Sequence, residues 1–418
     1  MSATMIWVFM ICLAISVPVA HAMLGGVAAA LWLDGKPMAV IAQRLYTPTQ
    51  SFPMLAIPFF ILAGNLMMSG RFGVYLVNIA RLLVGHFKGG LGQVSIIGSV
   101  MFGGVSGSAV ADASALGNAL IPVQKQQGFP GGFAAAVNSA SSTVSVLIPP
   151  SIPLILYGLV SNTSIVDLFI AGILPGLMLG IGMFLTVWLV AKRKDLPRSP
   201  LEGGFKAFKS QIFAAIPALL MPVFVIGTLR FGVATPTEVS VMAVGYAFAV
   251  SGLVYRDLSW KGIWDALTNT AMMTGAVMII IMASSTIQWV LTAERVPQDL
   301  AVWVAETIRE PWMVILALNL VMLVVGAFLD LPAAVLLLGP LFVTIGQAIG
   351  LDPVQLGLMM VVNLSIGLYT PPVGTTLFIS SAIARVGIGE VVKALVPFYL
   401  VALAVLMAIS FIPALTIY

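Results

Sequence analysis

The stretch Ile148-Pro149-Pro150-Ser151 decides the fold, because its double proline returns 222 residues later in Thr370-Pro371-Pro372-Val373. Both pairs lie inside long apolar segments. Proline has no amide hydrogen and its ring clashes with the carbonyl one turn earlier, so two in succession break a helix and free several carbonyl groups. At bilayer depth such backbone is tolerated only where it lines a cavity. The repeat therefore indicates two membrane helices that are broken midway.

The same offset aligns more of the chain than the prolines. It places Ser108 opposite Asp330, and it pairs identical residues at Gly104 and Gly326, Ala111 and Ala333, Leu116 and Leu338, and Gly117 and Gly339. Upstream of each break, segments 91–126 and 313–350 are apolar with a Gly- or Pro-containing turn near the centre. We expect each to be a re-entrant hairpin that enters and leaves the membrane on one side.

Composition indicates an all-α polytopic membrane protein. Hydrophobic residues form 60% of the 418 residues and charged residues 8%, whereas soluble domains average about 25% charged. About 20 apolar residues span a bilayer. We predict helices at 4–33, 51–69, 130–160, 164–191, 211–230, 236–255, 270–292, 354–384 and 390–417, with interfacial arms at 71–88 and 295–310.

Several classes are excluded or disfavoured. Ala20-His21-Ala22 resembles a signal-peptide cleavage site, but no Lys or Arg precedes it, so we expect a retained first helix. The single cysteine, Cys12, cannot form an internal disulfide, and His21 and His86 lack metal-ligand spacing. The net charge of +4 does not indicate nucleic acid. Neither a phosphate-binding loop nor a nucleophile–base constellation is present, so we predict no enzymatic activity.

Charge predicts the orientation. The longest polar loop carries six basic residues, Lys192, Arg193, Lys194, Arg198, Lys206 and Lys209, and positive charge favours the cytoplasm. Counting spans from this loop puts the N-terminus inside and the C-terminus outside. Of the 19 Lys and Arg residues, the layout leaves only Lys36, Arg44, Arg230, Arg295 and Arg309 outside. The two hairpins then open from opposite sides, as in inverted-topology transporters.

The first hairpin and break predict a cation site. Gly and Ser fill most of the hairpin turn at 103–109, and Ser and Thr crowd the segment before the first Pro–Pro. Freed carbonyls and hydroxyls are hard oxygen ligands, which suit Na⁺ better than a transition metal. Helix packing by small polar residues is the alternative. The candidate ligands of Na⁺ site 1 are Gly104, Ser108, Ser142, Ser145 and Ile148.

Asp330 leads a second predicted cation site. It stands between Leu329 and Leu331 in an apolar hairpin, and an ionisable group at that depth is a functional candidate. The alternative is that Asp330 only caps the second arm of its hairpin. The candidate ligands of Na⁺ site 2 are Gly326, Asp330, Gly367, Thr370 and Val373.

An anionic solute fits the remaining polar groups. Half-helix N-termini carry partial positive charge, while neither hairpin tip nor either Pro–Pro pair is flanked by Lys or Arg. Bound Na⁺ must then supply most of the positive field, which is a physical reason for coupling. Asp112 either lines the solute path or pins its hairpin to a neighbouring helix. The candidate substrate residues are Ser106, Asp112, Ser141, Ser151, Asn363 and Thr375.

Six stretches together resemble the large membrane subunit of TRAP (tripartite ATP-independent periplasmic) transporters, DctM-like proteins within a wider ion transporter superfamily. They are residues 57–64 (IPFFILAG), 102–112 (FGGVSGSAVAD), 148–153 (IPPSIP), 171–176 (AGILPG), 235–238 (TPTE) and 362–374 (VNLSIGLYTPPVG). The resemblance covers nearly the whole chain. One departure is Asp330-Leu331-Pro332, where the family often has Asp-Pro-Gly.

The resemblance implies an elevator mechanism with Na⁺ coupling, a small four-helix membrane partner, and a soluble periplasmic binding protein that delivers an organic acid such as a C4-dicarboxylate or sialic acid. It implies the inner membrane of a bacterium. The transport domain would comprise residues 91–160 and 313–384, and the scaffold residues 1–90 and 161–312. Residues 385–418 would form a separate C-terminal helix. The alternatives are a self-sufficient Na⁺/organic-anion symporter or antiporter, and a channel or membrane scaffold.

Overall fold

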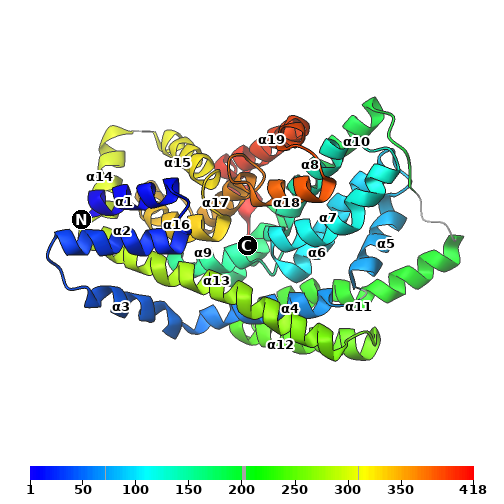
Figure 1. The fold of residues 1–418 in the computed structure, drawn as a ribbon, viewed down its shortest axis with the longest axis horizontal. Helices are drawn as coiled ribbons and strands as arrows, with labels where there is room; N and C mark the ends of the chain where they lie inside the picture. Colours follow the sequence, from blue (N-terminus) through cyan, green and yellow to red (C-terminus); the bar gives the residue numbers. More distant parts are fainter. Residues whose placement is uncertain (71, 200–203, 309) are drawn as a thin grey trace.

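The computed structural model describes residues 1–70, 72–199, 204–308 and 310–418, and these residues form helices and no strands (Figure 1). Arg309, expected outside the membrane, lies beyond the described residues. Within them, five helices are long and apolar enough to cross a membrane. They are α10 (Ile165–Arg193), α12 with the π-helical turn that follows it (Pro236–Val254), α13 (Trp260–Ala293), α16 (Leu331–Ala348) and α19 (Ile388–Phe411).

The structure contains helices at the first predicted hairpin and at the first predicted broken helix. The hairpin is α6 (Gly90–Ser106) and α7 (Ala109–Gln126); the broken helix is α8 (Gly131–Ser141), the 3-10 turn η3 (Ser142–Val146) and α9 (Ile152–Ser161). The α-helical pattern ends at Ser141 and the 3-10 turn at Val146, and the segment around Pro149-Pro150 is not helical, consistent with two prolines that have no amide to donate. Helix α9 restarts because the Ser151 hydroxyl accepts the amide of Leu154 at 3.3 Å, as a capping residue does.

The second copy has the same order of elements. Its hairpin is α15 (Pro311–Gly326) and α16, and its broken helix is α17 (Pro353–Gly367) and α18 (Thr375–Ala384). Asp352 starts α17 by accepting the amides of Val354 and Gln355, both at 2.9 Å. Both Pro–Pro peptide bonds are cis. Because α17 ends at Gly367 and α18 begins at Thr375, the helix expected at 354–384 is interrupted around the second Pro–Pro pair.

The remaining helices agree with most of the predicted spans. They are α4 (Ala56–Met68) after the 3-10 turn η2 (Phe52–Leu55), α5 (Phe72–Val84), α11 (Gly204–Arg230), α12 (Pro236–Ala249), the π-helical turn η4 (Val250–Val254), α14 (Val296–Thr307) and the 3-10 turn η5 (Pro413–Thr416). The starts predicted for α11 and α13 were too late, and one helix was missed. Helix α13 begins at Trp260 rather than near 270, since Ser259 caps it, and α3 (Ala39–Tyr46) with η1 (Thr47–Gln50) fills a segment for which no helix was predicted.

The single first helix predicted at 4–33 is wrong. The structure has α1 (Ser2–Ala14) and α2 (Val19–Leu33), joined by a turn in which Ser16 has a φ of +64° and Pro18 precedes α2. The sequence reading missed this turn because the apolar run is continuous through it. Each helix is about 20 Å long, too short to cross the hydrocarbon alone.

The N-terminus therefore lies beside the end of α2. The Met1 ammonium is 2.8 Å from Glu294 and 3.5 Å from Asp34. Glu294 precedes Arg295, so the N-terminus lies beside a residue that the charge pattern places outside. The side of the membrane on which the N-terminus lies stays a prediction. Figure 1 shows the N-terminus and α14 at the left end, and the end of α10 at the right.

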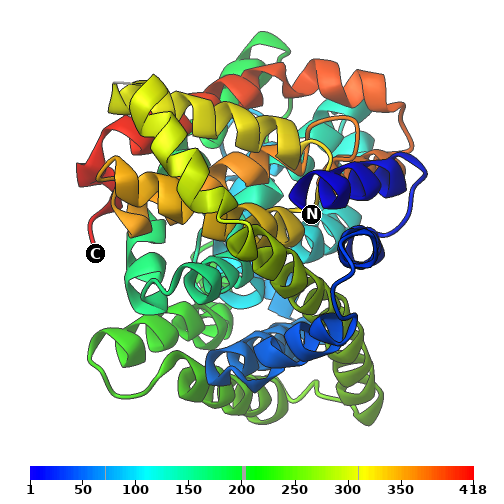
Figure 2. The same ribbon diagram turned by 90° about the vertical axis from the view of Figure 1, so that its left-hand side faces the viewer.

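The helices form two layers (Figures 1 and 2). One layer holds the hairpins, the broken helices and α19; the other holds α3, α4, α11, α12 and α13. Within the first layer the copies interlock, because α7 packs against α18, α16 packs against α9, and α8 packs against α18. The second arm of each hairpin thus contacts the half-helix that follows the other copy's break.

The α1–α2 contact predicts a difference between two adjacent glycines. A Cβ on Gly26 would lie 2.7 Å from the Met5 carbonyl oxygen, whereas one on Gly25 would meet only the Cys12 sulfur at 3.9 Å. We expect Gly26→Ala to lower the free energy of unfolding by about 1–3 kcal/mol, because the helices must separate. Gly25→Ala should be neutral or slightly stabilising. Melting temperatures in detergent compare the two, and equal values would contradict the close packing.

Candidate functional site

The tip of the first hairpin rests on the first Pro–Pro break. A Cβ on Gly103 would lie 2.6 Å from the Ser145 Cα, and one on Gly107 would meet the carbonyl group of Pro150. The turn itself is only Gly107 (φ +58°) and Ser108, whose hydroxyl caps α7 by accepting the Ala111 amide at 3.4 Å. The wider turn expected over 103–109 is wrong.

Residues of predicted Na⁺ site 1 surround this contact. The buried hydroxyls of Ser142 and Ser145 donate to the carbonyls of Ser139 (2.9 Å) and Ser142 (2.6 Å). A donating hydroxyl keeps lone pairs that can face a cation. Ile148 lies against Gly103. Gly104 is helical within α6 and faces Pro222 of α11, so close packing accounts for this glycine.

The second hairpin rests on the second break in a similar way. A Cβ on Gly367 would collide with the carbonyl group of Gly326. The Val373 amide donates to the Ala327 carbonyl at 3.2 Å, and the Thr370 hydroxyl donates to the Ile366 carbonyl at 2.7 Å. Four residues of predicted Na⁺ site 2 therefore lie at one backbone-to-backbone contact.

Asp330, the fifth, occupies the N-cap position of α16, but its side chain makes no capping hydrogen bond. The carboxylate interacts with the Leu331 backbone and with the Thr375 hydroxyl, while its Oδ1 atom is buried without a hydrogen-bond partner of its own. A carboxylate oxygen with free lone pairs beside a buried hydroxyl fits a cation that takes oxygen ligands.

A cavity of about 220 Å³ separates the two hairpin tips from α4 and α13. Ser108 and Asp330, which the 222-residue offset places opposite each other, both line it. The sequence reading missed the opposite wall, because nothing distinguishes those apolar residues from ordinary helix packing. The cavity is lined by Ile61, Gly107, Ser108, Ala109, Val110, Val146, Ile152, Pro153, Met273, Ala276, Val277, Asp330, Leu331, Pro332 and Leu368.

The six predicted substrate residues do not line this cavity. Asn363 donates to the carbonyl and to the side chain of Asn319, both at 2.9 Å. Ser141 accepts from Ser99 at 3.1 Å. Asp112 is fully buried, and neither of its carboxylate oxygens has a hydrogen-bond partner.

The other three predicted substrate residues lie at helix termini. Ser106 ends α6, and its hydroxyl accepts the Ser108 amide at 3.4 Å. Ser151 caps α9, and its hydroxyl also donates to the Val146 carbonyl. Thr375 begins α18 beside Asp330. The six residues are therefore spread over both copies rather than gathered in one pocket.

The sequence also did not predict a set of hydrogen bonds that joins the two copies. The Thr376 hydroxyl donates to the Ser139 carbonyl at 3.1 Å and lies 3.2 Å from the Ser139 hydroxyl. It is also 2.9 Å from the Leu368 carbonyl, to which it can donate. Asn138 donates to the Ser380 hydroxyl at 2.9 Å. The Ser- and Thr-rich composition beside both breaks was the available signal, but it does not say which side chains meet.

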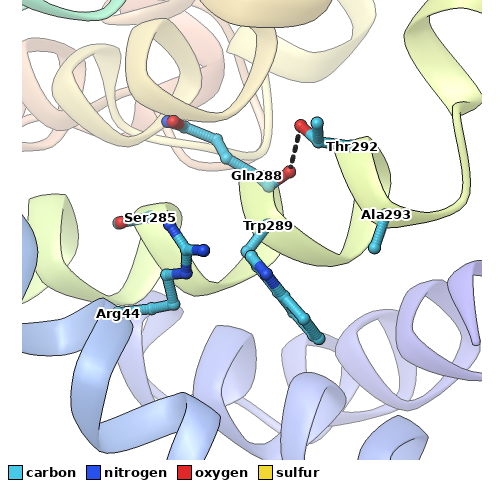
Figure 3. Close-up of a pocket in the computed structure, with 6 residues that line it drawn as sticks. All are labelled: Arg44, Ser285, Gln288, Trp289, Thr292 and Ala293. Carbon is cyan, nitrogen blue, oxygen red and sulfur yellow. Dashed lines mark hydrogen bonds between the residues drawn. The ribbon is translucent and has the colours of Figure 1, made fainter.

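A larger cavity, about 370 Å³, lies farther along α13 between that helix and α3 (Figure 3). Its lining residues are Arg44, Ser285, Gln288, Trp289, Thr292 and Ala293. The Arg44 guanidinium is 5.9 Å from the centroid of the Trp289 ring. Gln288 donates to the Leu336 carbonyl at 3.2 Å, and Thr292 to the Gln288 carbonyl at 2.8 Å. No predicted site residue lines it, so the candidate site is the cavity at the tips.

Residues 6–415 match the family model described as "Tripartite ATP-independent periplasmic transporter, DctM component". The chain belongs to the DctM family of TRAP transporter large permeases. The predicted resemblance is thereby confirmed over almost the whole sequence. Relatives in this family are named as transport permeases, so this chain is a transporter component and not an enzyme.

Several curated relatives cover nearly all of the chain. A 2,3-diketo-L-gulonate TRAP large permease of Escherichia coli is 35% identical, over 97% of this chain and 95% of its own length. A C4-dicarboxylate TRAP large permease of Pseudomonas aeruginosa is 36% identical (90% and 88%). A sialic acid TRAP large permease of Vibrio cholerae is 35% identical (90% and 88%).

A solved structure shares the fold of this TRAP permease. The YdaH transporter of Alcanivorax borkumensis matches with a TM-score of 0.66 at 14% identity, over 88% of this chain and 86% of that one. At this identity the likeness concerns the fold alone.

The first hairpin tip predicts a sharp difference between two left-handed glycines. Gly107 (φ +58°) is pressed against Pro150, whereas Gly128 (φ +89°) has open space around its Cα. Gly128→Ala should cost only the backbone strain, about 1–2 kcal/mol. Gly107→Ala adds a collision with backbone and should cost at least about 2 kcal/mol more. Thermal unfolding in detergent measures both, and equal losses would mean that the tip does not press on the break.

Proposed function

We propose that this TRAP large permease carries out Na⁺-coupled uptake of an organic acid anion, in a binding-protein-dependent transporter. The observation that supports this proposal most is the cavity where Ser108 and Asp330 meet. The two residues occupy corresponding positions in the two copies, and the cavity lies where both hairpin tips face α4 and α13. A solute held there contacts both copies and the other helix layer at once.

Coupling follows from the charge of this cavity. Among its lining residues in the described chain, Asp330 is the one charged side chain, and it is acidic. An organic anion beside an unneutralised carboxylate would be repelled in a low-dielectric site. Na⁺ bound at the two hairpin–break contacts removes that repulsion, so solute and Na⁺ bind best together. The five-residue sets around Ser108 and Asp330 are the two proposed Na⁺ sites.

The interlocked copies support an elevator mechanism. Since α7 packs on α18 and α16 on α9, the hairpins and broken helices of residues 91–160 and 313–384 hold each other and can move as one body. The layer containing α4 and α13 would be the scaffold against which they slide. The reciprocal packing of the two hairpin arms is what a two-fold repeat gives, and the proposal that the repeat is inverted rests on the charge pattern of the loops.

Partners and orientation complete the proposal. Relatives of this chain are named for C4-dicarboxylates, sialic acid and 2,3-diketo-L-gulonate, so an organic acid delivered by a soluble periplasmic protein is proposed here, together with a small four-helix membrane subunit. The protein would lie in the bacterial inner membrane with the basic loop after α10 in the cytoplasm. Because Met1 pairs with Glu294, the N-terminus as well as the C-terminus would face the periplasm.

Reconstitution tests the tripartite function. Proteoliposomes containing this chain and its small subunit should accumulate solute only when an inward Na⁺ gradient and the loaded binding protein are both present. The control replaces the inward Na⁺ gradient with an inward K⁺ gradient, which should not drive uptake. Full uptake by this chain alone would instead establish a self-sufficient symporter.

Asp330 tests the coupling. We expect Asp330→Asn to raise the Na⁺ concentration for half-maximal uptake roughly tenfold, because a charged ligand becomes neutral. Ser108→Ala, which removes one hydroxyl, should raise it less. Asp299→Asn changes an exposed acid on α14 and should have no effect. If correctly folded Asp330→Asn keeps the wild-type Na⁺ dependence, Asp330 is not a Na⁺ ligand.

A further inference from the structure

The walls of the cavity at the hairpin tips are almost entirely apolar. Among the residues that line it within the described chain, only Ser108 and Asp330 have polar side chains. Both belong to hairpin tips, so the polar side chains lie on the hairpin side of the cavity, which forms its hydrophilic pole. The facing wall consists of Ile61 on α4 and of Met273 and Val277 on α13. The cavity thus has one hydrophilic pole and an apolar body.

The separation of the polar and apolar parts of the wall determines how an organic acid can lie in the cavity. A carboxylate is stabilised only at the pole, near the Ser108 hydroxyl and the proposed Na⁺ sites. The rest of the solute must then contact Ile61, Met273 and the other apolar side chains. A hydroxyl group or a second carboxylate placed there would lose its water without gaining a partner, which lowers affinity roughly tenfold or more per group.

The volume adds a size limit. The cavity of about 220 Å³ is smaller than pockets for drug-sized molecules, which measure about 300–1,000 Å³. This size favours a small acid over a sugar acid with a nine-carbon backbone.

We infer that this permease selects a small monocarboxylate with a short, branched aliphatic body, rather than a dicarboxylate or a polyhydroxylated acid. The inference rests on the proposed function, since it names the solute class of the same site. The carboxylate lies at the Ser108–Asp330 pole together with Na⁺, and the alkyl group fills the space against α4 and α13.

Direct binding tests this without the selectivity of the periplasmic protein. The chain is purified with its small subunit in detergent containing Na⁺, and the rise in melting temperature is titrated with isovalerate, succinate and N-acetylneuraminate. We expect isovalerate to bind at least tenfold more tightly than succinate, and N-acetylneuraminate not to bind. Equal or tighter binding of either polar acid would overturn the inference. Na⁺-driven uptake of such an acid by the complete transporter would meanwhile leave the proposed function intact, whereas no Na⁺-dependent uptake of any acid would refute that function.

A matched pair of methionines on α13 tests the location. Met273 lines the cavity, while its neighbour Met272 is exposed. Met273→Gln should weaken isovalerate binding about tenfold and improve binding of 2,3-dihydroxyisovalerate, because the wall gains a hydrogen-bonding amide. Met272→Gln should change neither. If Met273→Gln does not fold, Ala276→Ser alters the same wall.

The cavity beside Arg44 is the competing location for an anion. Arg44→Gln should leave isovalerate binding unchanged, because Arg44 does not line the cavity at the tips. Loss of binding in Arg44→Gln, with wild-type affinity in Met273→Gln, would move the solute site to that cavity and overturn the inference.

Discussion

Backbone groups freed at the two Pro–Pro breaks impose the constraint on which the structure depends. A helix that stops inside an apolar body leaves amides and carbonyls that water cannot reach, and each must find a partner. The Val373 amide is satisfied by Ala327 of the second hairpin. At the first break the Ser151 hydroxyl donates to the Val146 carbonyl, and at the second break the Thr376 hydroxyl donates to the Leu368 carbonyl. The breaks therefore need both their hairpins and their hydroxyl residues.

Glycine lets those partners come close enough. Gly107 allows the first tip to rest on Pro150, and Gly367 allows the second break to rest on Gly326. With the tips held by backbone contacts, the side chain of Asp330 is not needed to cap its helix and makes no capping bond. A partly buried acid with an unpartnered oxygen atom is what a coupling ion can use. Backbone atoms thus stabilise the contact between hairpin and break, while the Asp330 side chain is left for the proposed ion binding.

The copies also hold one another. Thr376 binds Ser139, and Asn138 binds Ser380, so each tie joins a segment before the first break to one after the second. These ties lie inside the layer of hairpins, whereas the cavity lies at its boundary with α4 and α13. Around the cavity, the described residues of the two layers face each other mainly across apolar side chains, which suits the sliding proposed above.

The amino-acid sequence by itself determined the membrane class, the two broken helices and their hairpins, and the family, because proline chemistry, apolar length and local motifs act within short segments. It failed at residues 4–33, where an uninterrupted apolar run conceals the turn at Ser16 and Pro18. Only the tertiary structure decided that Asn363 binds Asn319 rather than facing the cavity. It also decided that Ile61 and Met273 close that cavity opposite Asp330. Which face of a helix meets which neighbour depends on contacts between segments hundreds of residues apart, and no local pattern in an apolar chain encodes them.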